Sequence, residues 1–148
     1  MQKRLLASTK QWMHWSNTFL NVGWKNPCST WSGFGPRRSN GCAYCLDMHW
    51  KDLRAIGEGE QRLYSLDAWR ECPYYTDRER AALSWTEAVT LIANDHVPDA
   101  VYEEVRRFFS EKELSDLTLA VCAINAWNRL SISARIVPGG YHPANAAK

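Results

Sequence analysis

The chain has 148 residues, of which 45% are hydrophobic and 23% charged, a size and composition typical of one globular domain. No apolar run approaches the roughly 20 residues that cross a bilayer, and the N-terminus lacks the apolar core of a secretory signal, so we expect neither a membrane span nor secretion. The formal net charge is +2, but residues 1–46 contain six basic and no acidic side chains, a density too low to indicate a nucleic-acid partner.

Residues 1–39 form a basic, tryptophan-rich segment that differs from the rest of the chain. The segment contains four of the eight tryptophans, no acidic residue, and frequent glycine, proline and serine from residue 23 onward. Such a pattern favours at most one short helix, at about residues 5–22, before a connector that is long for a compact domain. We therefore divide the chain into this atypical segment, a helical domain at 40–140 and a flexible tail at 141–148.

From residue 40 onward the pattern indicates consecutive helices. Asn40 is a favourable N-cap for the first of them, and Gly57 in "AIGEGE" is a natural stop. A shorter helix is expected over about residues 60–69. No strand-like alternation of apolar and polar residues occurs, so the predicted fold class is all-α.

Two capping boxes mark the starts of later helices, "TDRE" at 76–79 and "SEKE" at 110–113. In a capping box the first hydroxyl accepts from the amide of the glutamate, and the glutamate carboxylate reaches back to the first amide. The first box opens a helix to about residue 93, and the second opens a long helix to about residue 135. Pro98 falls near the first turn of a helix between them, where its missing N–H costs nothing.

Two of the five cysteines lie close to a histidine in the stretch "NGCAYCLDMH". On an α-helix the spacings of three and four residues put Cys42, Cys45 and His49 on one face. The N–H groups and dipole of a helix N-terminus stabilise a thiolate, and His49 could take the proton of Cys45. A thiolate that attacks a peroxide becomes a sulfenic acid, which a second thiol converts to a disulfide.

The spacing leaves other readings open. A zinc site would need a fourth ligand, and a compact knuckle is more usual than a continuous helix. A structural disulfide across two residues closes too small a loop to stabilise much. The odd number of cysteines, without a secretory signal, indicates a reducing, cytoplasmic compartment with mostly buried thiols. Cys122, in the apolar stretch "LAVCAIN", is accordingly expected in the core.

The chain resembles the AhpD-like alkylhydroperoxidases of the carboxymuconolactone decarboxylase family. The resemblance is carried most specifically by "NGCAYCLDMH" and "INAWNRL", and it extends over about 100 of the 148 residues. It implies an AhpD-like helical bundle with the Cys-x-x-Cys pair at the N-terminus of a core helix. It also implies a homo-oligomer, such as a trimer or hexamer.

The same resemblance implies a thiol-dependent peroxidase or disulfide reductase that acts on hydroperoxides. Cys45 would be the attacking thiolate, Cys42 the resolving thiol and His49 the base that activates Cys45. Electrons would come from a dithiol carrier, such as a lipoylated or thioredoxin-like protein. Neither a bound cofactor nor a metal is implied.

The sequence departs from the family pattern before the cysteine pair. The family has a glutamate twelve residues before the first cysteine, where it relays protons with the histidine, and Thr30 stands at that position here. Threonine cannot replace a carboxylate as an acid or base. Residues 5–39 are therefore either divergent or read out of frame relative to an intact family member. Spacing in the sequence alone cannot place any of three later glutamates beside His49, namely Glu58, Glu60 and Glu87.

The missing glutamate keeps an alternative open, a catalytically impaired or non-enzymatic oligomeric member of the family. A lactone decarboxylase is a further alternative, although that branch of the family does not use a Cys-x-x-Cys pair. A zinc-binding module is the last alternative. We expect the chain to act as a peroxidase and to be located in the cytoplasm.

Overall fold

The computed structural model describes residues 39–143, and within this range every regular element is helical. The predicted all-α class is therefore confirmed. The elements in chain order are α3 (Ala43–Ala55), α4 (Glu60–Tyr64), the 3₁₀-helix η1 (Ser65–Ala68), α5 (Asp77–Thr90), α6 (Ile92–Asp95), α7 (Asp99–Phe108) and α8 (Glu111–Ser133). The short helix predicted at residues 5–22, and Thr30, lie outside the described residues.

Both predicted capping boxes are present. At the start of α5, the Thr76 hydroxyl accepts from the Glu79 amide at 3.3 Å, and the Glu79 carboxylate accepts from the Thr76 amide at 2.8 Å. At the start of α8, Ser110 and Glu113 make the same two bonds, at 3.3 and 2.8 Å. Each box satisfies two amides that a helix start leaves without an intrahelical partner.

The predicted N-cap of the first described helix was wrong by two residues. Gly41 has a φ of 66°, a left-handed conformation that glycine adopts without a steric penalty, and the helix begins only after Cys42. Asn40 instead donates a hydrogen bond from its side chain to Asn125 of α8, at 2.7 Å. The predicted stop is confirmed, because Gly57 has a φ of 90° just after α3 ends.

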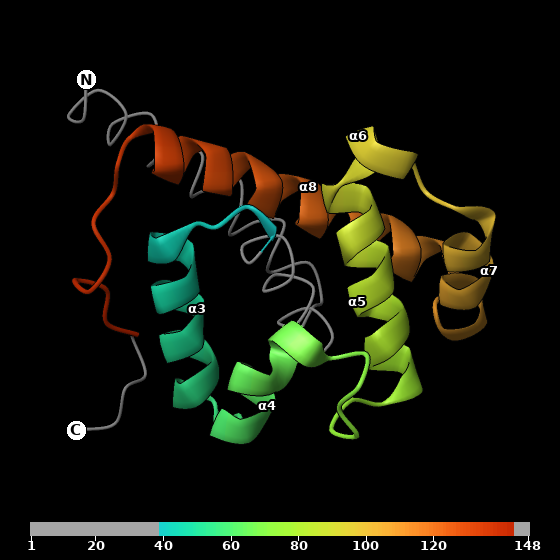
Figure 1. The fold of residues 1–148 in the computed structure, drawn as a ribbon, viewed down its shortest axis with the longest axis horizontal. Helices are drawn as coiled ribbons and strands as arrows, with labels where there is room; N and C mark the ends of the chain where they lie inside the picture. The colour runs from blue at the N-terminus through green and yellow to red at the C-terminus, as the bar shows by residue number, and fades with distance from the viewer. Residues whose placement is uncertain (1–38, 144–148) are drawn as a thin grey trace.

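Two clusters of buried side chains form the interior, and α5 contributes to both. One cluster joins α5, α7 and α8 and includes Trp85 and Val121. The other joins α3, α4 and α5 and includes Leu53 and Leu83. Figure 1 shows the resulting arrangement, with α8 running across the molecule, beside the N-terminal end of α3 and crossing α5. The helix that carries the cysteines is thus held by packing at both of its ends.

The expectation that Cys122 lies in the core was wrong, because its thiol is exposed. On α8 the buried neighbours are Val121 and Ile124. Successive residues of an α-helix differ by about 100° in direction, so the residue after Val121 points away from the interior. An apolar stretch of sequence does not by itself identify the buried face.

Candidate active site

Cys42 and Cys45 are brought together at the start of α3 and joined as a disulfide, with their Cα atoms 5.3 Å apart. Cys42 is the N-cap residue, and its Sγ accepts from the Cys45 amide at 3.4 Å. Both residues are almost completely buried, with exposed fractions of 1% and 3%. Gly41, with its left-handed φ of 66°, directly precedes Cys42, the N-cap of α3.

This position suits reversible thiol chemistry. In the reduced state, Cys45 lies in the first turn of α3, where the free amides and the helix dipole stabilise a negative sulfur. In the structure the two sulfurs are joined as a disulfide at the start of this helix. The arrangement therefore suits a pair that alternates between a dithiol and a disulfide at a helix N-terminus.

His49 lies one helical turn after Cys45 on the same helix, with about a fifth of its side chain exposed. Its Nδ1 atom is 3.5 Å from Oδ2 of Asp52, three residues further along α3. The sequence predicted the shared helix for Cys45 and His49. The role of His49 as the base stays a prediction.

Sequence reasoning missed the carboxylate next to His49. Asp52 accepts a hydrogen bond from the hydroxyl of Tyr141, with a distance of 2.7 Å to Oδ1. This bond, together with burial and the carboxylate charge, raises the pKa of Tyr141 to about 12. The spacing of three residues between His49 and Asp52 could have indicated the helical pair. Nothing local could have indicated Tyr141, which is 89 residues away along the chain.

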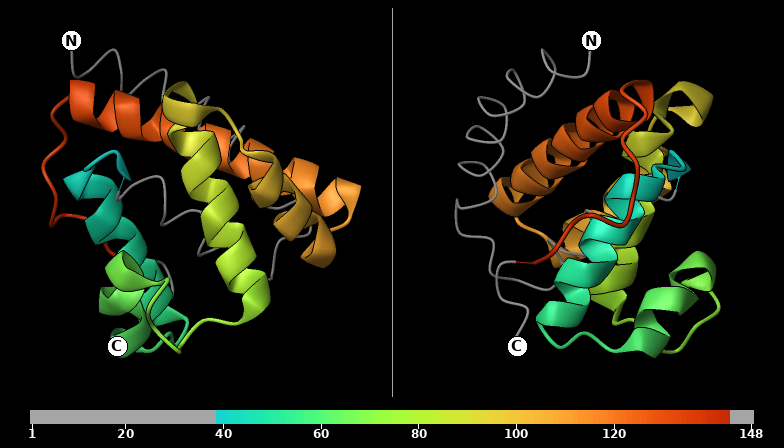
Figure 2. Two further views of the ribbon diagram at one scale, coloured as in Figure 1. Left: turned by 45° about the vertical axis from the view of Figure 1, so that its right-hand side comes forward. Right: turned by 90° about the vertical axis from the view of Figure 1, so that its left-hand side faces the viewer.

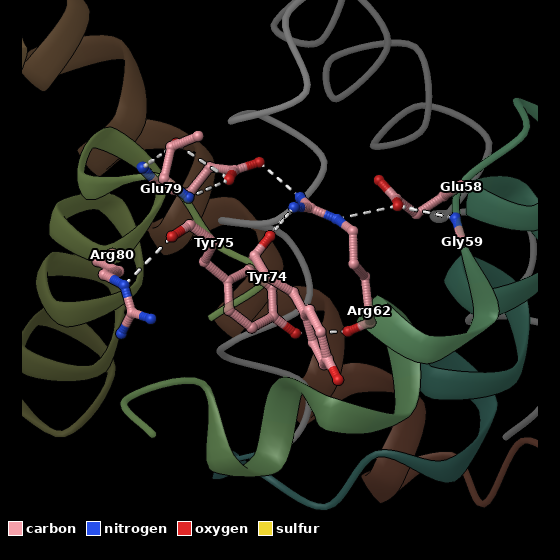
Figure 3. A network of polar contacts seen from close by, with 8 residues as sticks. Glu58, Gly59, Arg62, Tyr74, Tyr75, Glu79 and Arg80 are labelled. Carbon is pink, nitrogen blue, oxygen red and sulfur yellow. Dashed lines mark hydrogen bonds and ion pairs between the residues drawn. The ribbon is translucent and has the colours of Figure 1, made fainter. Parts of the chain in front are cut away.

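Two of the three later glutamates have other partners, and the third is exposed. Glu58 accepts from Nε of Arg62 at 3.1 Å, in the polar network drawn in Figure 3. Glu87 pairs with Nη2 of Arg70 at 2.6 Å and accepts from the Trp69 indole at 2.9 Å. Glu60 begins α4 and is exposed. The acidic group that the structure places at His49 is therefore an aspartate on its own helix.

The alternative of a metal site has no ligand set in the part of the chain that the structure describes. Among residues 39–143, no three His, Cys, Asp or Glu side chains come together in a way that could hold a metal ion. The same range contains no helix that is both long and apolar enough to cross a membrane.

Residues 38–88 match the model of the carboxymuconolactone decarboxylase family. The chain is also 50% identical over 94 residues to the uncharacterized protein YdfG of Bacillus subtilis (strain 168), and 27% identical over 80 residues to the uncharacterized protein YnjA of Escherichia coli (strain K12). The matches include 64% and 54% of this chain. They span only 64% of the length of YdfG and 43% of that of YnjA.

Two crystal structures resemble the fold. One is a protein of unknown function from Agrobacterium tumefaciens, named as a candidate antioxidant defence protein AhpD. It is 37% identical, with a TM-score of 0.83, and the match covers 93% of this chain and 91% of that one. The other is the debrominase Bmp8 without ligand, 18% identical with a TM-score of 0.65, covering 78% of this chain and 62% of that one. At that identity the second likeness concerns the fold alone.

Proposed function

We propose that this chain, which belongs to the AhpD-like group of the carboxymuconolactone decarboxylase family, reduces hydroperoxides through Cys42 and Cys45. The observation that carries the proposal is the buried Cys42–Cys45 pair at the N-terminus of α3, with His49 one turn further on. A pair that is already within bonding distance can resolve a sulfenic acid without rearrangement of the fold.

The reaction has three steps. His49 takes the proton of Cys45, and the thiolate attacks one peroxide oxygen, so that an S–O bond forms as the O–O bond breaks. The departing alkoxide takes the proton from His49 and leaves as an alcohol. The thiol of Cys42 then attacks the Cys45 sulfenic acid, which forms the disulfide and releases water. A dithiol donor finally reduces this disulfide by exchange and is itself oxidised.

The burial of the two sulfurs bears on the identity of the donor. Both cysteines have exposed fractions of 3% or less, and thiol–disulfide exchange requires direct contact between the attacking sulfur and the disulfide. A slender dithiol arm, as on a lipoylated protein, meets this requirement more easily than the broad surface of a thioredoxin-like protein. We propose the lipoyl type as the donor, a homo-oligomer as the working form and the cytoplasm as the location.

The proposal is tested by peroxide consumption with a small dithiol as the reductant. Cys45→Ser should abolish turnover, whereas Cys42→Ser should consume one equivalent of peroxide and leave a sulfenic acid that dimedone labels. Cys72→Ser removes a thiol outside the pair and is the matched control, which should retain full turnover. Equal turnover in Cys45→Ser and the parent chain would contradict the proposal.

A catalytically impaired or non-enzymatic member is the second candidate, and the observation that favours it is Thr30 at the place of the family glutamate. The same assay distinguishes the two. A chain whose Cys42–Cys45 pair is reduced by a dithiol and reoxidised by the corresponding disulfide, but which consumes no peroxide, would match the second candidate.

A further inference from the structure

The chain that follows α8 turns back and is fastened to α3. The amide of Gly139 donates to Oδ2 of Asp47 at 3.0 Å. The ammonium group of Lys51 donates to the carbonyl groups of Gly139 and Tyr141, both at 3.2 Å. Figures 1 and 2 show this C-terminal segment, in red, descending along α3. The segment at 139–141 therefore covers the face of the helix that carries Asp47 and Lys51.

One carboxylate on this helix connects the segment to the candidate base. Oδ1 of Asp52 accepts from the Tyr141 hydroxyl at 2.7 Å, while Oδ2 lies 3.5 Å from Nδ1 of His49. In this bond the Tyr141 phenol is the donor and the Asp52 carboxylate is the acceptor. Asp52 thus has one oxygen fixed by a residue from the far end of the chain and the other directed at His49.

We propose that Asp52 is the positioning residue for His49 and that Tyr141 fixes Asp52 in place. An ionised carboxylate at Nδ1 favours the proton on that nitrogen and assigns proton transfer with Cys45 to Nε2. This positioning role extends the proposed peroxidase function, and its expected effect on peroxide turnover rests on that function. Asp52 places a carboxylate beside His49. It could therefore act in place of the family glutamate, at whose position this chain has Thr30, which cannot serve as an acid or base.

The ring nitrogens of His49 provide a test that does not require turnover. Neutral imidazole in water favours the proton on Nε2, whereas an acceptor at Nδ1 favours the other tautomer. The ¹⁵N chemical shifts of His49 should therefore show a proton on Nδ1 in the parent chain and on Nε2 in Asp52→Asn. Tyr141→Phe should retain the parent tautomer in part, since it removes the hydroxyl but leaves the carboxylate.

Asp47→Asn is the matched control. Asp47 lies on the same helix and fastens the same segment, but its partners are Gly139 and Lys51. The control should keep the parent tautomer of His49. Turnover with peroxide and a dithiol should fall about 10- to 100-fold in Asp52→Asn, the range for loss of an outer partner that orients a functional histidine. It should fall about two- to tenfold in Tyr141→Phe, as for the loss of one hydrogen bond.

The two proposals fail in different ways. If the parent chain shows the Nδ1 proton but no peroxide turnover, the function fails and the positioning role of Asp52 stands. If the parent turns over peroxide while Asp52→Asn keeps the parent tautomer, the positioning role is overturned. Equal losses in Asp47→Asn and Asp52→Asn would also overturn it, since attachment of the segment would then explain both.

Discussion

Arg62 of α4 and Glu79 in the first turn of α5 form an ion pair with a distance of 2.7 Å between Nη2 and Oε1. The Glu79 side chain is almost buried, and its second oxygen accepts from the amide of Thr76 at 2.8 Å. Arg62 also donates to the carbonyl of Tyr74. Figure 3 shows Arg62, Tyr74 and Glu79 converging between the two helices. One arginine therefore joins α4 to the start of α5, next to the apolar cluster that supports α3.

Replacement of Arg62 by methionine should destabilise the fold by about 2–4 kcal/mol, because it leaves a nearly buried carboxylate without its cationic partner. The range lies toward the low side of values for buried pairs since Arg62 is itself about a quarter exposed. The free energy of unfolding in urea measures the effect. Lys112→Met is the control, because Lys112 pairs with Asp116 at an exposed site, and it should change stability by less than about 0.5 kcal/mol.

Acid should weaken the same contact. Burial raises the pKa of the Glu79 carboxyl, but hydrogen bonds from Thr76 and Arg62 outweigh burial, so that the pKa lies below the usual 4.5. A carboxyl whose pKa is lowered by folding stabilises the protein above its unfolded pKa and loses this contribution as the pH falls through the folded value. We expect the free energy of unfolding to decrease below about pH 4.5. The decrease should be smaller in Glu79→Gln, and equal slopes in both proteins would contradict the prediction.

The second capping box gives a more exposed counterpart. Hydrogen bonds from the Ser110 amide and hydroxyl, with a further one from Arg78, lower the pKa of Glu113 to about 2. Substitution Ser110→Ala removes the hydroxyl bond and should move this pKa upward toward 4.5, as an NMR titration of the Glu113 carboxyl would show. Loss of the cap should also cost about 1 kcal/mol of stability. An unchanged titration in Ser110→Ala would mean that Arg78 and the amide alone hold the carboxylate.

Local signals in the sequence identified the helices and the cysteine pair, whereas contacts distant in sequence were not predictable. The two capping boxes, and the helical spacing of Cys45 and His49, depend on residues within one turn of each other. The N-cap at Asn40 was predicted wrongly, because the left-handed turn at Gly41 delays the helix. The bond between Asp52 and Tyr141 depends on the return of the chain to α3, for which neither residue carries a local signal.

Asn128 on α8 is a buried polar residue whose cost can be measured. Its side chain is completely buried, and neither amide atom has a hydrogen-bond partner within the described part of the chain. An unsatisfied buried polar group costs about 1–3 kcal/mol. Replacement by leucine, which has the same number of side-chain heavy atoms and the same branching, should therefore stabilise the protein by about 1 kcal/mol, measured by urea unfolding.

Asn125, one turn earlier on α8, provides the comparison. Its amide donates to the Thr90 hydroxyl at 3.1 Å and to the Val121 carbonyl at 3.0 Å, and its oxygen accepts from Asn40 at 2.7 Å. Asn125→Leu should therefore destabilise the protein by about 1–3 kcal/mol, because it leaves polar partners without bonds. The Asn125 amide is satisfied and partly buried, whereas the Asn128 amide is unsatisfied and completely buried, so the effects of the two substitutions should have opposite signs. A loss of stability in Asn128→Leu as large as that in Asn125→Leu would show that the Asn128 amide is bonded in solution.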